Sequence, residues 1–94
     1  MDRDLLLEII ETYGIEKQMM QCIEKMGELI VAINKYIRAG FDETCIDAYN
    51  NVIEEIADVQ IMTEQMRLMF DGAAVDEVIV EKLERMRGRL DGCC

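Results

Sequence analysis

The sequence contains no His, no Pro and no Trp, and its aromatic residues amount to two Phe and three Tyr. Without His, the chain cannot form Ser-His-Asp or Cys-His catalytic groups, His-based metal sites or the Glu-x-x-His pairs of di-iron helical bundles. Without Pro, and with six Gly, it has few helix breakers. These absences predict a helical protein whose polar chemistry depends on carboxylates.

Positive charge is also scarce, because 10 Lys and Arg stand against 20 Asp and Glu, which gives a formal net charge of −10. This balance argues against binding to a bare nucleic-acid backbone. The N-terminal region lacks the basic start and the long apolar segment of a signal peptide, and the longest unbroken apolar run, Leu29 to Ile33, is far too short to cross a bilayer. We therefore expect a cytoplasmic protein with no nucleic-acid partner and no membrane partner.

The four cysteines show no CxxC spacing, which is the usual signal of a zinc or redox site. In a reducing compartment we expect Cys22 and Cys45 to be thiols in the core. Cys93 and Cys94 form a terminal pair, which we expect to belong to a disordered tail over residues 91–94.

The spacing of apolar residues predicts a single all-α domain with four helices and no strand. The predicted helices span Asp4–Thr12 (within an N-terminal segment, residues 1–15), Glu16–Ala39, Glu43–Phe70 and Val75–Leu90. Gly14, Gly40 and Gly72 fall at the breaks, where a left-handed residue often ends a helix. Asp42 and Asp71 are expected to cap the helices that follow them.

Short connections favour antiparallel neighbours, so the second and third predicted helices should form an antiparallel hairpin with the other two flanking it. One side of the second helix is apolar and is expected to be core: Met19, Cys22, Ile23, Met26, Leu29, Ile30, Ile33 and Ile37. Its opposite side is only partly polar, since Val31 and Ala32 interrupt it, so something should pack there as well. A chain of this length has a thin core, and we expect a four-helix bundle completed by a homodimer, or a homotetramer.

Carboxylates interrupt the apolar middle of the third predicted helix. Glu55 and Asp58 are three residues apart and share a face with Val59 and several methionines. Such carboxylates must be neutralised by protonation, by Lys or Arg, or by a metal ion. On the second helix Glu24 and Glu28 are four residues apart, so two packed helices could bring all four side chains together. Mg²⁺ favours such oxygen ligands, with Mn²⁺ as the alternative.

At these residues the chain resembles the all-α nucleoside triphosphate pyrophosphatases, a superfamily that includes MazG-like proteins, dimeric dUTPases and phosphoribosyl-ATP pyrophosphohydrolase. The segment IEKMGELIVAINKY is similar to the family's ExxE helix, and VIEEIADVQIM is similar to its ExxD helix, with Glu55 and Asp58 at the ExxD positions. The resemblance continues through VDEVIVEKLERMRGRL and covers nearly the whole chain. It implies one MazG-like helical domain over residues 1–94.

The resemblance also implies a function: Mg²⁺-dependent hydrolysis of a nucleoside or deoxynucleoside triphosphate to the monophosphate and pyrophosphate, as nucleotide-pool housekeeping. The implied catalytic residues are Glu28, Glu55 and Asp58, and the implied metal ligands are these three with Glu24. The implied phosphate-binding residues are Lys35, Lys82 and Arg85, for each of which ordinary surface charge is the alternative.

Lys25 departs from the family pattern. Family members usually have EExxEL in the first motif, whereas this chain has EKMGEL, so Lys25 stands at the first ExxE position. Glu24 could turn inward as a substitute, while Lys25 could neutralise a carboxylate or contact a phosphate. Two alternative functions follow: a catalytically impaired family member that acts as a nucleotide-binding or regulatory helical oligomer, and a helical oligomerisation module with solvated acidic faces.

Overall fold

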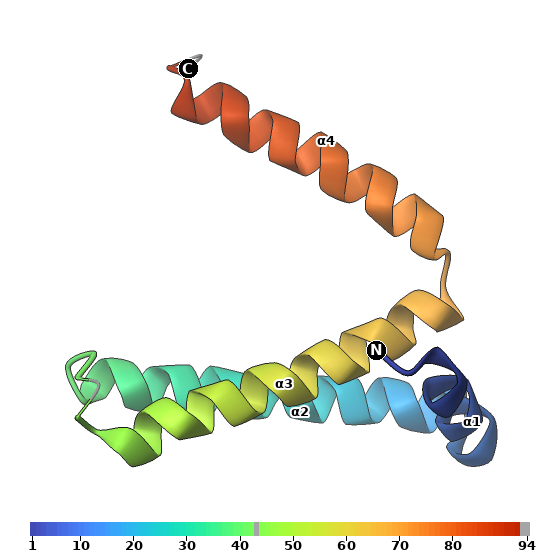
Figure 1. The fold of residues 1–94 in the computed structure, drawn as a ribbon, viewed down its shortest axis with the longest axis horizontal. Helices are drawn as coiled ribbons and strands as arrows, with labels where there is room; N and C mark the ends of the chain where they lie inside the picture. Colours follow the sequence, from blue (N-terminus) through green and yellow to red (C-terminus); the bar gives the residue numbers. More distant parts are fainter. Residues whose placement is uncertain (43, 93–94) are drawn as a thin grey trace.

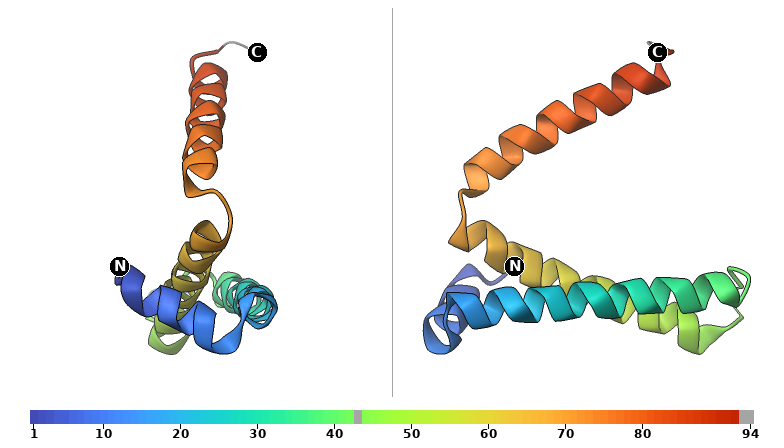
Figure 2. Two further views of the ribbon diagram at one scale, coloured as in Figure 1. Left: turned by 90° about the vertical axis from the view of Figure 1, so that its right-hand side faces the viewer. Right: turned by 180° about the vertical axis from the view of Figure 1, so that it is seen from behind.

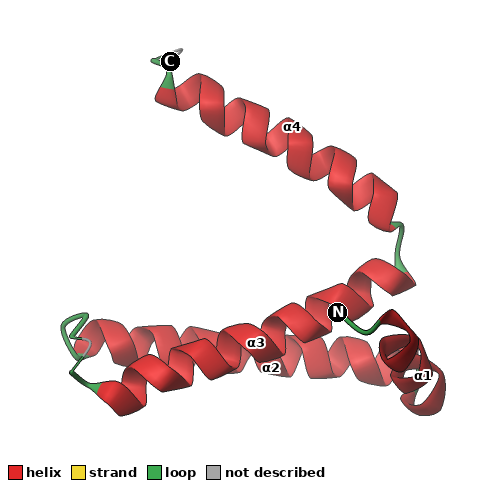
Figure 3. Ribbon diagram, viewed as in Figure 1, coloured by secondary structure: helices red, strands yellow, loops and turns green. Residues whose placement is uncertain are grey.

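The computed structural model describes residues 1–42 and 44–92, and this part of the chain folds into four α-helices without any strand (Figures 1 and 3). The helices are α1 (Arg3–Tyr13), α2 (Ile15–Arg38), α3 (Ile46–Met69) and α4 (Gly72–Leu90). The all-α prediction and the order of the elements are confirmed. Asp91 ends α4 with its N–H donated to the carbonyl of Arg87, and the predicted tail residues Cys93 and Cys94 lie outside the described residues.

The break between α1 and α2 is a single residue, Gly14, whose φ of 94° lies in the region that favours glycine. Its N–H donates to the carbonyl of Ile10 at 2.8 Å, so the chain turns sharply and α1 lies across the start of α2. Gly40, after α2, also has a positive φ, as expected. Gly72 does not: it is the first residue of α4, so the prediction that it would end the preceding helix is wrong.

The two predicted caps have different outcomes. Asp71 caps α4, because its Oδ1 accepts the N–H of Ala74 at 3.1 Å, so this prediction is confirmed. Asp42 does not cap α3, because its Oδ1 accepts the N–H of Thr44 at 2.9 Å and closes a turn before the helix begins. The predicted start of this helix at Glu43 lies outside the described residues.

The centre of the fold is the predicted antiparallel hairpin, in which α2 and α3 lie side by side (Figure 2). The buried residues of α2 are Gln18, Cys22 and Ala32, and those of α3 are Met62 and Gln65. Small side chains such as Cys22 and Ala32 allow the two helices to approach closely. Helix α1 crosses the open end of the hairpin, touches both helices and buries Leu6.

Much of the predicted core face of α2 is exposed within one chain. Cys22 is buried as expected, but Ile23 and Ile30 are 70% and 61% exposed, and Met26, Ile33 and Ile37 are also exposed. Within one chain, the contact with α3 instead uses the flank of α2 that contains Ala32, which is 1% exposed. Cys45 is exposed as well, so the prediction that it is a core thiol is wrong.

These exposed side chains belong to a set of apolar residues on α2 and α3, which we call the apolar face. It consists of Ile23, Met26, Ile30, Ile33 and Ile37 of α2 with Tyr49, Ile53 and Ile56 of α3. Residues three and four apart lie along one side of a helix. On α2 the row is turned by about a quarter turn from the buried Cys22 and Ala32, whereas on α3 it lies nearly opposite to the buried Met62 and Gln65.

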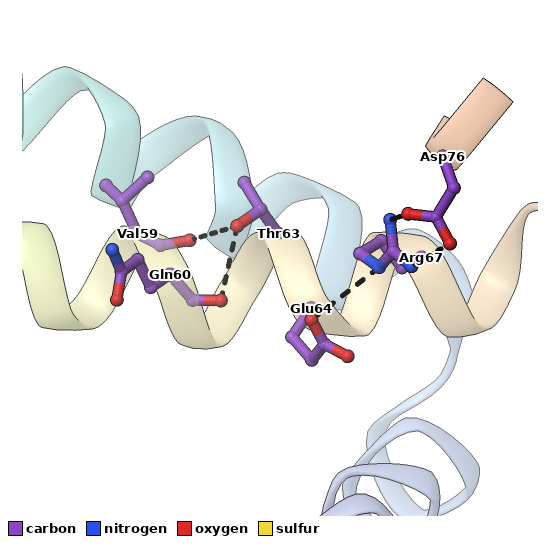
Figure 4. Close-up of polar contacts among 6 residues, drawn as sticks. All are labelled: Val59, Gln60, Thr63, Glu64, Arg67 and Asp76. Carbon is purple, nitrogen blue, oxygen red and sulfur yellow. Dashed lines mark hydrogen bonds and ion pairs between the residues drawn. The ribbon is translucent and has the colours of Figure 1, made fainter. Parts of the chain in front are cut away.

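Helix α4 diverges from the hairpin and, within the described residues, contacts α3 alone among the helices (Figures 1 and 2). It contains no buried residue. The elbow between α3 and α4 is linked by Arg67, whose Nη1 lies 3.1 Å from Oδ1 of Asp76 and whose Nη2 lies 3.2 Å from Oδ2 (Figure 4). Glu64 also approaches Arg67, at 3.7 Å from its Nε. None of the described helices is both long and apolar enough to cross a bilayer.

Candidate metal centre

Three of the predicted site residues converge where α2 meets α3. Glu28 comes from α2, and Glu55 and Asp58 come from adjacent turns of α3. One carboxylate oxygen from each of them lies within 4.8 Å of the other two, and all three side chains are half-buried. The three-residue spacing places Glu55 and Asp58 on one side of α3, and the antiparallel packing brings Glu28 opposite them.

Lys25 lies in the middle of this group. It precedes Glu28 by one helical turn, and its Nζ lies 3.3 Å from Oε2 of Glu28 and 3.9 Å from Oδ2 of Asp58. The ammonium therefore bridges the two helices through carboxylates on each of them. The hydrogen bond to Glu28, followed by the charges of Glu28, Asp58 and Glu55, raises the pKa of Lys25 against the opposing effect of burial. One of the roles expected for Lys25, neutralising a carboxylate, is confirmed.

Glu55 is the carboxylate with the least compensation. Its Oε2 is covered and has no hydrogen-bond partner. Burial raises the pKa of Glu55, the neighbouring Glu28 and Asp58 raise it further, and only Lys25 acts in the opposite direction. A single lysine thus faces three carboxylates, and one covered oxygen still lacks a donor or a cation.

Glu24 borders the site but stands outside the three-carboxylate group. It lines an open groove of about 520 Å³ beside the group, together with Gly27, Glu28, Val31, Asn51 and Glu55. Gly27 has open space where a Cβ would stand, which keeps this part of the groove clear. Glu24 is exposed, so in this arrangement it is a residue of the groove wall.

Lys35 lies in a second groove, of about 480 Å³, further along the same side of the hairpin. Asp47, Ala48, Asn50, Asn51 and Glu54 complete its lining. Asn51 borders both grooves and thereby connects Lys35 with the carboxylates. Sequence reasoning missed Asn51, although its position four residues before Glu55 predicts that it lies on the same side of α3.

Lys82 and Arg85 are not brought to the carboxylates within one chain. Both are exposed on α4, which does not touch α2 in the described part of the chain. The described part of one chain therefore does not bring them to a phosphate bound at the carboxylates.

The donor set suits a hard divalent cation. Mg²⁺ takes oxygen ligands in octahedral geometry, usually one or two carboxylates completed by water and phosphate. Glu28, Glu55 and Asp58 offer carboxylate oxygens from two helices, and the covered Oε2 of Glu55 has no hydrogen-bond partner. The residues present therefore fit such an ion.

The chain matches no protein-family model, and no curated protein or solved structure was found to be similar to it. The resemblance to the all-α pyrophosphatases rests on the two motifs and their spacing.

Proposed function

We propose that this chain is a Mg²⁺-dependent nucleoside triphosphate pyrophosphohydrolase that converts a nucleoside or deoxynucleoside triphosphate into the monophosphate and pyrophosphate. One observation carries the proposal: Glu28, Glu55 and Asp58 converge across the α2–α3 contact. These are the residues that stand at the ExxE and ExxD positions of the family that the sequence resembles.

The chain's own groups have separable roles in this reaction. The chemistry that Mg²⁺ supplies when bound is neutralisation of charge on the phosphates and polarisation of the attacking water. Glu28, Glu55 and Asp58 would hold the cation between the helices, and a carboxylate oxygen of this group that does not coordinate the cation would accept a proton from the water. Lys35, one groove away, offers a cation for the departing pyrophosphate.

The substrate enters along the two grooves that Asn51 connects. A chain with a net charge of −10 repels a free nucleotide anion, so the substrate form is the complex of the nucleotide with Mg²⁺. The wall at Gly27 and Val31 offers apolar contact, and the amide of Asn51 offers one hydrogen-bond donor group and one acceptor. This combination accommodates the sugar and base while the carboxylates bind the cation.

The active form is a homodimer, or a homotetramer built from it, because a single chain leaves too much surface uncovered. The radius of gyration is 16.7 Å, whereas a compact domain of this length has a radius of roughly 12 Å. The accessible surface is 7247 Å² for a mass of 10.9 kDa, against about 5,600 Å² for a typical monomer. The excess is larger than the roughly 800 Å² that each partner contributes to a standard interface.

The apolar face is where the second copy binds. Two hairpins that pack these faces together form a four-helix bundle, and a twofold axis lets the same surface serve both chains. Helix α4 then extends beyond its own hairpin and lies against the partner. Its last turns carry four of the chain's ten Lys and Arg, which complement the acidic hairpin and bring Lys82 and Arg85 toward the partner's groove.

Lys25 favours a second candidate function, a catalytically impaired family member that binds nucleotide or regulates a partner as a helical oligomer. The ammonium of Lys25 already pairs with Glu28 and Asp58, two of the three proposed metal ligands. If Lys25 stays there in the presence of nucleotide, the chain binds without turnover.

A panel of canonical, modified and deoxynucleoside triphosphates, assayed with Mg²⁺ for pyrophosphate release, tests the proposal. At least one should be hydrolysed, and Asp58→Asn should lower turnover by about a hundredfold or more, because it removes a negative ligand without changing shape. Asp4→Asn on α1 makes the same charge change outside the hairpin and should leave turnover unchanged. Near-normal turnover of Asp58→Asn would contradict the assigned site.

If no triphosphate in the panel is hydrolysed, thermal melts separate the two remaining candidate functions. A chain that binds nucleotide silently gains thermal stability from Mg²⁺ with a non-hydrolysable analogue. A helical oligomerisation module gains none.

A further inference from the structure

We infer that Lys25 is an internal counter-ion that competes with the divalent cation for the same carboxylates, so that the cation binds tightly only together with a phosphate chain. The inference rests on the proposed function and deepens it, since it states how the site is kept closed to free metal ions. Family resemblance does not supply it, because this position departs from the family pattern.

The ammonium occupies the place that a cation would take. Nζ of Lys25 contacts Oε2 of Glu28 on α2 and Oδ2 of Asp58 on α3, at 3.3 and 3.9 Å. These two residues belong to the group of three whose oxygens lie within 4.8 Å of one another. Lys25 therefore uses ligands from both helices, as a shared metal ion would.

Simultaneous occupancy by the ammonium and a divalent cation is unfavourable. A Mg²⁺ ligand oxygen lies about 2.1 Å from the ion. If Oε2 of Glu28 bound the ion while Lys25 kept its contact of 3.3 Å, the two positive charges would be separated by at most about 5.4 Å. They would also compete for the same oxygen lone pairs. Lys25 must therefore leave when the cation enters, and the cost of breaking its ion pairs weakens the binding of a free ion.

The side chain is able to leave without disturbing the fold. Lys25 is 32% exposed, and its flexible four-carbon stem can redirect the ammonium while α2 stays in place. The groove that borders Glu28 is open to solvent beside it. The exchange therefore needs only a change of rotamer.

A phosphate chain offsets the loss of the ion pairs that Lys25 makes with Glu28 and Asp58. The displaced ammonium loses two carboxylate partners, and the nearest new anion in a metal–nucleotide complex is a phosphate oxygen. Lysine binds phosphate as a compact point charge. Cation and phosphate then each strengthen the binding of the other, and this coupling is reciprocal.

Mn²⁺ binding to the full chain, followed by electron paramagnetic resonance and calorimetry, tests the inference without relying on turnover. Two ligands are compared, free Mn²⁺ and the preformed Mn²⁺–tripolyphosphate complex. The variants are Lys25→Met, which keeps the stem and removes the charge, and Lys17→Met, which makes the same change elsewhere on α2. Lys25→Gln serves as a second variant, and circular dichroism verifies that each is folded.

We expect Lys25→Met and Lys25→Gln to bind free Mn²⁺ at least about tenfold more tightly than the unmodified chain. Their preference for the tripolyphosphate complex over the free ion should fall by a similar factor, because no ammonium remains to bind the phosphate. Lys17→Met should change neither value by more than about twofold.

The outcomes separate the inference from the proposed function. If the Lys25 variants bind free Mn²⁺ no more tightly than Lys17→Met, Lys25 is a structural ion pair and the inference fails, while the metal site of the proposed function stands. If neither the unmodified chain nor any variant binds Mn²⁺ in either form, both fail together.

Discussion

Arg67 and Asp76 join the hairpin to α4 through two close contacts, with Nη1 3.1 Å from Oδ1 and Nη2 donating to Oδ2 at 3.2 Å. This paired geometry fixes the orientation of both side chains. Since α4 buries no residue of its own, the contact at the elbow and the cap at Asp71 are what define the start of the helix. The direction of α4 therefore depends on a few side chains next to the hinge.

Loss of this contact should loosen the elbow. Asp76→Asn removes the charge that Arg67 binds, and we expect chymotrypsin to cut after the exposed Phe70 faster than in the unmodified chain. Asp91→Asn removes a carboxylate that pairs with Arg87 at the far end of α4 and should leave the rate unchanged. Equal cleavage rates in the two variants would show that Arg67 does not hold the elbow.

The contact between α2 and α3 should be sensitive to volume at Ala32, which is 1% exposed. Ala32→Leu forces extra methyl groups between two close helices, and we expect it to lower the free energy of unfolding by roughly 1–3 kcal/mol. Ala57→Leu adds the same volume at an exposed position of α3 and should change it by less than about 0.5 kcal/mol. Urea denaturation measures both. A neutral effect of Ala32→Leu would mean that α2 meets α3 on another face.

Glu55 should make the metal-free protein less stable as the pH rises. Burial, followed by the neighbouring Glu28 and Asp58, raises the pKa of Glu55 above the usual 4.5, so the folded chain releases this proton less readily than the unfolded chain does. The associated stabilisation is present below that usual value and is lost as the pH rises through the higher pKa of the folded state. Glu55→Gln cannot ionise, so we expect it to melt at a higher temperature than the unmodified chain at neutral pH, with the difference shrinking toward acid.

Thermal melts without metal, from about pH 5 to about pH 8, test this prediction. Addition of Mg²⁺ should reverse the order, because the ion stabilises the ionised carboxylate of the unmodified chain and finds only a neutral amide at this position in the variant. If Glu55→Gln melts lower than the unmodified chain throughout, the carboxylate is satisfied in the metal-free fold.

The apolar face should control assembly. Ile30→Glu introduces a charge at its centre, and burying that charge against a second copy is costly, so we expect sedimentation velocity to show a shift from dimer to monomer. Asn50→Asp adds the same charge at an exposed position of α3 beside Lys35 and should leave the dimer intact. A stable folded monomer of the unmodified chain at micromolar concentration would contradict the proposed dimer.

The sequence alone was sufficient for the local features of this protein. Helical periodicity and the lack of Pro predict four helices, the glycine at position 14 predicts the first break, and Asp71 is recognisable as a cap. The three-residue spacing of Glu55 and Asp58 already places both carboxylates on one side of α3. Each of these features depends on residues within a turn or two of one another, so the backbone geometry of a helix is enough to determine them.

Only the tertiary structure decided which sides of the helices meet. Periodicity identifies the isoleucine row of α2 as apolar, but it cannot tell whether that row faces α3 or a second chain. The small Cys22 and Ala32 allow the closer approach, and this choice also determines that Glu28 faces Glu55. It likewise places Lys25 between the carboxylates and leaves Lys82 and Arg85 on a helix that diverges from them. The physical reason is that packing depends on the size and register of side chains from two distant segments, and the period of one helix contains no information about its neighbour.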